Sequence, residues 1–96
     1  MMPTKIQKFH LGDLVEVHKG GILVPAGSQA YILYSYADRY NIPASTDTYG
    51  IFVLLPGLGK SGYAISWFYD TDLRLIKKRT LGSILKAERL NRGEEQ

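Results

Sequence analysis

Hydrophobic and polar residues alternate over most of the first eighty positions, a pattern typical of strands that bury one face. Clusters of glycine, proline and small polar residues separate the alternating stretches and indicate turns and loops. The pattern therefore predicts five strands, at Leu14–His18, Ala30–Tyr36, Tyr49–Leu55, Tyr63–Tyr69 and Leu73–Lys77.

Alternation also assigns the residues of each strand to a face. In the second strand it places Tyr31 with Leu33 on one face, and the other face then carries Ile32, Tyr34 and Tyr36. The third strand is almost continuously apolar, so we expect it to be buried on both faces. The residues expected to form the core are Val15, Val17, Ile51, Val53, Trp67 and Leu73.

The pattern changes after Thr80, which has the side chain of a helix N-cap. Leu81, Ile84 and Leu85 follow at helical spacing, and Gly93 supplies a stop signal. We predict one short amphipathic helix over about residues 81–92. Its apolar stripe either covers the open end of the sheet or docks on another chain.

Five short strands and one helix predict a mainly β protein, because five strands are too few for a two-sheet sandwich. They suit a small, strongly bent barrel over about residues 11–79, with the helix as an addition near the C-terminus. With 96 residues, the chain has room for one domain, so we expect 1–96 to be a single domain.

Two segments resemble known proteins. Gly12-Asp13-Leu14-Val15-Glu16-Val17 resembles the opening of Src-homology-3-like small barrels, including the KOW and Tudor types. The segment from Ser66 to Ile76, with its aromatic strand and acidic turn, is similar to small uncharacterised proteins of tailed bacteriophages. The first resemblance implies a five-stranded small barrel, and the second implies a virion component or a small phage accessory protein. The aromatic-rich start and tryptophan pair of proline-peptide binders are missing, so that ligand is not expected.

Composition limits the cellular compartments in which the protein is expected. The chain has no cysteine, which excludes disulfides, thiolate metal sites and cysteine nucleophiles and favours a reducing compartment. Its first eight residues lack the apolar stretch of a signal peptide, and no apolar run approaches the ~18–20 residues that span a bilayer. We expect a protein that is made in the cytoplasm of a host cell, is not bound to a membrane, and is then either retained there or incorporated in a virion.

Motifs for catalysis or metal binding are incomplete. Gly59-Lys60-Ser61 lacks the earlier glycine of a phosphate-binding loop, and a strand follows it where a helix is required. His10 and His18 have no partners at metal-ligand spacing, and no carboxylate pairs with a nucleophile motif. We therefore expect no enzymatic activity, no cofactor, no metal and no small-molecule substrate.

Positive charge is modest but unevenly distributed. Twelve Lys and Arg against nine Asp and Glu give a net charge of +3, and the sequence pI is about 9.2. The basic residues of the last strand are followed by others in the helix. They form an ordinary solvated edge, a strip that contacts phosphates, or a surface that docks on an acidic protein. The nucleic-acid candidates are Arg74, Lys77, Lys78, Arg79 and Tyr69.

Seven tyrosines are more than a barrel of this size can bury, so some should be exposed on a binding surface. The apolar run Ile22-Leu23-Val24 lies in an expected loop, where it either folds over the barrel mouth or inserts into a neighbour. Because no nucleic-acid motif is complete, the sequence favours a protein-interaction or assembly module, with a nucleic-acid-binding barrel as the alternative. The protein-interaction candidates are Ile22, Leu23, Val24, Tyr34, Tyr36, Tyr40, Leu81, Ile84 and Leu85.

Overall fold

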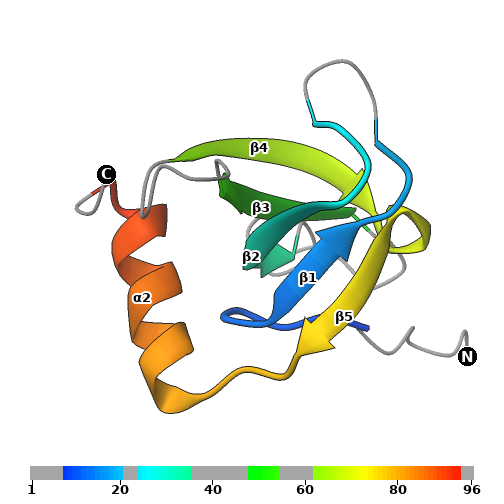
Figure 1. Ribbon diagram of the computed structural model, residues 1–96. Helices are drawn as coiled ribbons and strands as arrows, with labels where there is room; N and C mark the ends of the chain where they lie inside the picture. Colours follow the sequence, from blue (N-terminus) through cyan, green and yellow to red (C-terminus); the bar gives the residue numbers. More distant parts are fainter. Residues whose placement is uncertain (1–7, 21–23, 36–47, 55–61, 94–96) are drawn as a thin grey trace, which may run out of the picture.

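The five alternating stretches form five antiparallel strands in the computed structural model, which describes residues 8–20, 24–35, 48–54 and 62–93 (Figure 1). The strands are β1 (Leu14–Val17), β2 (Ser28–Ser35), β3 (Thr48–Leu54), β4 (Gly62–Tyr69) and β5 (Leu73–Lys77). A short 3-10 turn, η1 (Asp70–Asp72), joins β4 to β5, and one helix, α2 (Leu81–Asn91), follows β5. The observed bounds differ from the expected ones by no more than two residues.

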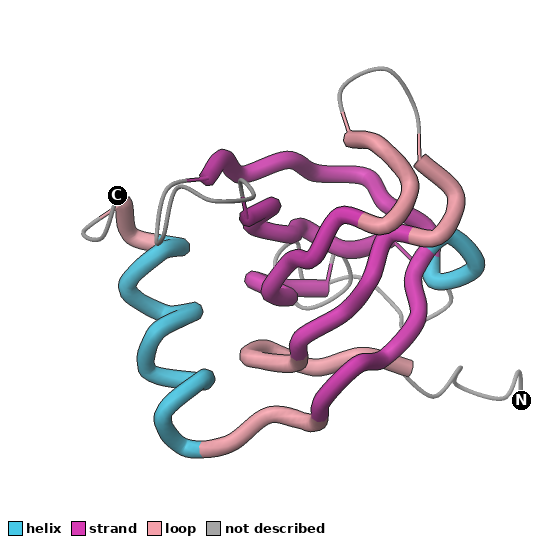
Figure 2. The backbone as a smooth tube through the Cα atoms, viewed as in Figure 1, coloured by secondary structure: helices cyan, strands magenta, loops and turns pink. Residues whose placement is uncertain are grey.

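The strands form one sheet in the order β4-β3-β2-β1-β5. The first four make a meander, and β5 returns to pair with β1, which curls the sheet into a half-barrel (Figures 1 and 2). The predicted fold class, a mainly β and strongly bent five-stranded sheet with one helix near the C-terminus, is confirmed.

One face of the sheet encloses what we call the barrel core. Five of the six predicted core residues belong to it, and the side chain of the sixth, Trp67, lies outside the described part. Phe9, which precedes the first strand and was not expected in the core, is 1% exposed and packs edge-on against Tyr49, with the ring centroids 5.5 Å apart. The barrel core consists of Phe9, Val15, Val17, Val24, Ala30, Ile32, Tyr49, Ile51, Val53 and Leu73.

The opposite face of β2 and β3 packs against α2. Leu33 and Phe52 from the strands meet Ala87 and Leu90 from the helix in a second cluster, the helix core. Strand β3 is therefore covered on both faces, as its almost continuous apolar sequence predicted. In the part of the chain that the structure describes, no helix is long and apolar enough to cross a membrane.

The prediction that Ile32 and Tyr34 share a face is wrong. Ile32 is opposite Ile51 and Tyr34 is opposite Gly50, so two steps along β2 match one step along β3. This β-bulge turns Tyr34 toward the helix core together with Leu33. Gly50 makes the arrangement possible, because a methyl group there would overlap the Tyr34 ring.

The face of α2 that packs on the sheet also differs from the predicted stripe. Thr80 is the N-cap of the helix, as expected, and its Oγ1 accepts a hydrogen bond from the Ser83 N–H at 3.1 Å. Ala87 and Leu90 are buried, whereas Leu81 is 74% and Leu85 is 44% exposed. The apolar stripe was expected either to cover the sheet or to dock on another chain. Leu81 and Leu85 do not cover the sheet.

Candidate functional site

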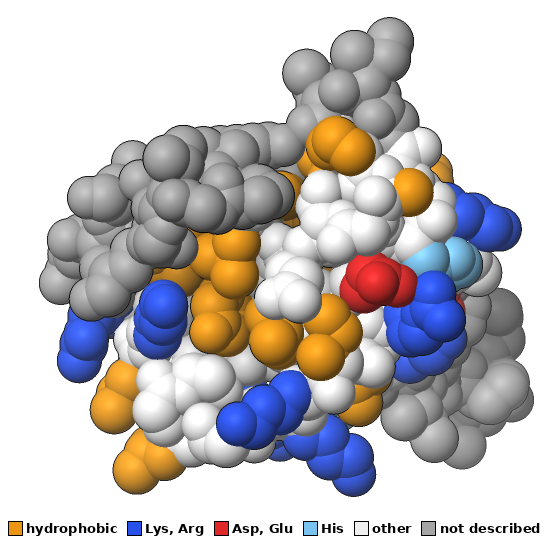
Figure 3. Space-filling view, in the orientation of Figure 1, with side chains coloured by type: hydrophobic (Ala, Val, Ile, Leu, Met, Phe, Trp, Pro, Cys, Tyr) orange, Lys and Arg blue, Asp and Glu red, His pale blue; other side chains and the backbone are white. Residues whose placement is uncertain are grey.

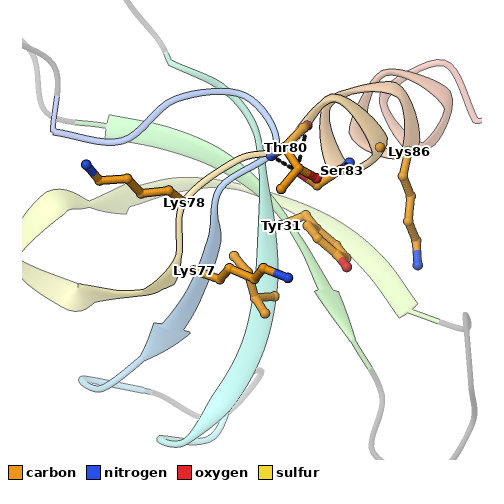
Figure 4. Close-up of a pocket in the computed structure, with 9 residues that line it drawn as sticks. Tyr31, Lys77, Lys78, Thr80, Ser83 and Lys86 are labelled. Atoms are coloured by element: carbon orange, nitrogen blue, oxygen red, sulfur yellow. Dashed lines mark hydrogen bonds between the residues drawn. The ribbon is translucent and has the colours of Figure 1, made fainter.

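A groove lies where the first turns of α2 meet the start of β1, the middle of β2 and the end of β5 (Figure 4). Its volume is about 270 Å³, slightly below the ~300–1,000 Å³ usual for pockets that enclose a small molecule. The groove is therefore better suited to contacting part of a larger ligand. We call it the basic groove; it is lined by Gly12, Leu14, Tyr31, Lys77, Lys78, Thr80, Gly82, Ser83 and Lys86.

Gly12 brings the helix to this position. Its φ of +93° suits glycine, and its N–H donates to the Ile32 carbonyl at 3.0 Å. A Cβ at Gly12 would lie 2.9 Å from the backbone N and Cα of Ile84, so the first turns of α2 pack directly on this glycine. Because the backbone is so close, the N-terminal part of the helix borders the sheet and forms one wall of the groove.

Three lysines line the basic groove and come from separate segments. Lys77 ends β5, Lys78 follows it, and Lys86 belongs to the second turn of α2. Figure 4 shows Lys77 directed toward Tyr31 and Lys78 directed away from it. Among the nine lining residues there is no carboxylate, so the lysine charges have no counter-charge within the groove.

Tyr31 lies between two of these lysines. It is half-buried, pairs with Leu14 across β2 and β1, and packs against the helix core. The Lys86 Nζ is 5.2 Å from the centroid of the Tyr31 ring, a cation–π distance, and Lys77 lies on the other side (Figure 4). The groove thus combines positive charge with an aromatic surface.

The polar groups at the start of α2 bond to each other. The Thr80 N–H donates to Ser83 Oγ at 2.8 Å, and the Ser83 N–H donates back to Thr80 Oγ1 at 3.1 Å. This capping box uses the donors that a ligand would otherwise meet on these two residues. The lysine ammonium groups are therefore the strong cationic donors of the basic groove.

A second hollow, of about 430 Å³, adjoins the basic groove and shares Lys78 with it. It contains one carboxylate, that of Asp13, whose side chain is 6% exposed. Both Asp13 oxygens accept backbone hydrogen bonds, Oδ2 from His10 N–H at 2.9 Å and Oδ1 from Arg79 N–H at 2.8 Å. The surface of the second hollow is therefore basic; its lining is Lys8, His10, Asp13, Leu75, Lys78 and Arg79.

The five residues proposed for nucleic-acid contact do not form one strip. Lys77 and Lys78 line the basic groove, and Arg79 lines the second hollow. The Arg74 guanidinium is 2.9 Å from Glu16 Oε1, so its charge is balanced locally. Tyr69 is 59% exposed and is the last residue of β4. Through η1 it connects to the first residue of β5, whereas Lys77 is the last residue of β5, so Tyr69 and Lys77 belong to opposite ends of this strand.

Lys86 and Tyr31 were not among the nucleic-acid candidates. Helical periodicity places Lys86 on the outside of an isolated helix, and only the docking of α2 brings it beside β2. Alternation assigns Tyr31 to a face of its strand, but it does not indicate that the helix packs on this face. The pairing of Leu14 with Tyr31 and the contact of Ile84 with Gly12 join residues that are far apart in the sequence, and no short motif predicts them.

The protein-interaction candidates are also dispersed. Val24 is 2% exposed in the barrel core, so it is not available to a partner, and this part of the expectation is corrected. Tyr34 packs against the helix core and Ile84 on Gly12, which leaves Leu81 and Leu85 as the exposed members. The remaining candidates, Ile22, Leu23, Tyr36 and Tyr40, lie outside the described residues.

Figure 3 shows Lys and Arg side chains around a band of hydrophobic surface between α2 and the strands. Within residues 8–20, 24–35, 48–54 and 62–93, no three His, Asp or Glu side chains gather as a ligand set for a metal ion. Comparison of the chain with protein-family models, curated proteins and solved structures gave no match.

Proposed function

We propose that this protein is a non-enzymatic binding module and that the basic groove contacts the phosphates of a nucleic acid. The observation that supports this most is that Lys77 and Lys86 flank Tyr31 while Lys78 lines the same groove, with no carboxylate among the lining residues. Basic residues and a tyrosine gathered on one hollowed face favour nucleic-acid binding over ordinary solvated charge.

Counterion release sets the expected strength. Each phosphate contact with a single strand contributes about −0.7 to the slope of log affinity against log salt concentration. Three lysine contacts then give a slope of about −2, so affinity should fall roughly 20-fold between 50 and 200 mM salt. A nucleic acid with only three phosphate contacts is held weakly. This weak binding fits a module whose ligand makes further contacts outside the groove.

The test is fluorescence anisotropy with labelled oligonucleotides, comparing the wild type with two variants. Lys77→Ala/Lys86→Ala removes two groove charges, whereas Lys19→Ala removes one exposed lysine beyond the opposite end of β1. We expect the double variant to bind at least 10-fold more weakly at low salt and Lys19→Ala to bind like the wild type. The same loss of log affinity per removed charge in the two variants would show that only net charge matters and would reject the basic groove as the site.

We also propose that the half-barrel is a Src-homology-3-like small barrel. The strand order β4-β3-β2-β1-β5 and the 3-10 turn before the last strand support this assignment. The further proposal of a virion component or phage accessory protein rests on the resemblance of the segment from Ser66 to Ile76 alone.

A second candidate function is protein interaction or self-assembly, supported by the exposure of Leu81 and Leu85 one turn apart on α2. A second copy of the chain is the partner that can be tested directly. Light scattering over a range of concentrations should then show a dimer that Leu81→Ser/Leu85→Ser converts to a monomer. A wild type that stays monomeric at every concentration would reject self-assembly through this face.

A further inference from the structure

The surroundings of Tyr31 bear on which kind of nucleic acid the groove would accept. We propose that the basic groove takes an unpaired strand, with one base against the Tyr31 ring and phosphates at the flanking lysines. This proposal rests on the proposed function, since it concerns the same groove, and it adds the class of ligand.

The Tyr31 ring is positioned to stack on a base. Lys86 covers one side of the ring at 5.2 Å, and the side toward Lys77 borders the groove (Figure 4). The ring is half-buried and held by β2, so little of its freedom is lost on binding. An unpaired base can turn its flat face to such a recessed ring, whereas the bases of a duplex are stacked on each other and present only their edges.

The basic surface continues beyond the groove. Lys78 points away from Tyr31 (Figure 4) and also lines the second hollow, together with Lys8 and Arg79. A strand of several nucleotides can therefore contact basic residues of both hollows, with Lys78 between them.

The experiment compares a labelled oligothymidylate of about 12 nucleotides, within the ~4–16 nucleotides usual for small single-strand sites, with a duplex of the same length. We expect the wild type to bind the single strand more tightly at equal salt. Tyr31→Ala should weaken this binding about 5- to 150-fold without changing the salt slope, because it removes stacking and no charge. Tyr31→Phe should remain near wild type, and Tyr69→Ala serves as the matched tyrosine control.

Tyr31 also packs against the helix core, so Tyr31→Ala must be shown to fold by circular dichroism. If it does not fold, Tyr31→Leu keeps apolar volume without an aromatic face, and the same loss of affinity is expected. Arg79→Ala should weaken binding of the 12-nucleotide strand and leave a strand of about four nucleotides unaffected, because the short strand reaches one hollow.

The outcomes separate the two proposals. If the wild type binds neither probe at low salt, the proposed function fails and the inference fails with it. If the wild type binds the duplex as tightly as the single strand, and Tyr31→Leu binds like Tyr69→Ala, the inference is overturned while nucleic-acid binding stands.

Discussion

The buried carboxylate of Asp13 accepts a hydrogen bond from the backbone N–H of Arg79, at 2.8 Å and across 66 residues of sequence. Its second oxygen accepts from the His10 N–H at 2.9 Å. Asp13 therefore fastens the segment between β5 and α2 to the turn that precedes β1. This segment carries Lys78 and leads to the helix that carries Lys86, so the contact fixes the relative positions of the groove lysines.

Removing this carboxylate should destabilise the protein markedly. Asp13→Ala leaves two backbone N–H groups without their charged acceptor, and we expect a loss of about 3 kcal/mol in the free energy of unfolding. Urea denaturation measures this loss. Glu16→Ala is the control, because an exposed ion pair contributes less than about 1 kcal/mol. Equal effects of the two substitutions would contradict the structural role of Asp13.

Gly12 and Gly27 have almost the same backbone conformation but different surroundings. Their φ angles are +93° and +92°, yet a Cβ at Gly12 meets the Ile84 backbone at 2.9 Å and one at Gly27 meets nothing within 4 Å. Gly27→Ala should cost about 1 kcal/mol from backbone strain alone. Gly12→Ala should cost at least about 1 kcal/mol more, because α2 must move. Thermal denaturation compares the two variants, and equal melting temperatures would show that α2 does not pack on Gly12.

Gly50 and Tyr34 should be energetically coupled. Gly50→Ala places a methyl group where the Tyr34 ring lies, so the ring must leave its site against the helix core. We expect a loss of about 2 kcal/mol, in the range for overpacking. In the double variant with Tyr34→Ala the methyl group finds space, so the combined loss should be smaller than the sum of the single losses. Additive losses in the double-mutant cycle would contradict the bulged register of β2.

The hydroxyl of Tyr49 anchors the segment before β1. It accepts hydrogen bonds from the N–H groups of Lys8 at 3.1 Å and Phe9 at 3.2 Å. Tyr49→Phe keeps the ring in the barrel core and should cost about 1–2 kcal/mol, because two backbone donors lose their acceptor. Hydrogen exchange should become faster at these two amides and remain unchanged at β1. Unchanged exchange at Phe9 would show that other contacts hold this segment.

Periodicity was sufficient to predict the strands and the ends of the helix. β5 has the predicted bounds because Leu73–Lys77 is enclosed by a turn and a change of pattern. Alternation failed in β2, since the bulge at Tyr34 depends on Gly50 in another strand. The packed face of α2 was missed because Leu81 and Leu85 are apolar, whereas the small Ala87 makes the close contact.

The basic groove could be predicted only in part. The run Lys77-Lys78 is visible in the sequence as a concentration of charge. The local sequence does not predict that Lys86 and Tyr31 complete the groove. Their contact requires α2 to pack closely on the sheet, and this close packing requires a residue without a side chain at Gly12. The ion pair between Arg74 and Glu16, which removes Arg74 from the basic surface, likewise depends on strand register.

The salt dependence of single-strand binding tests the central claim most directly. Anisotropy titrations of the wild type, Lys19→Ala and Lys77→Ala/Lys86→Ala use a labelled oligothymidylate of about four nucleotides, which reaches one hollow, and give the slope of log affinity against log salt concentration. The three-lysine groove predicts slopes of about −2 for the wild type and about −0.7 for the double variant. Lys19→Ala should keep the wild-type slope. A double variant with the wild-type slope, or a wild type that does not bind at 50 mM salt, would contradict phosphate contact at this groove.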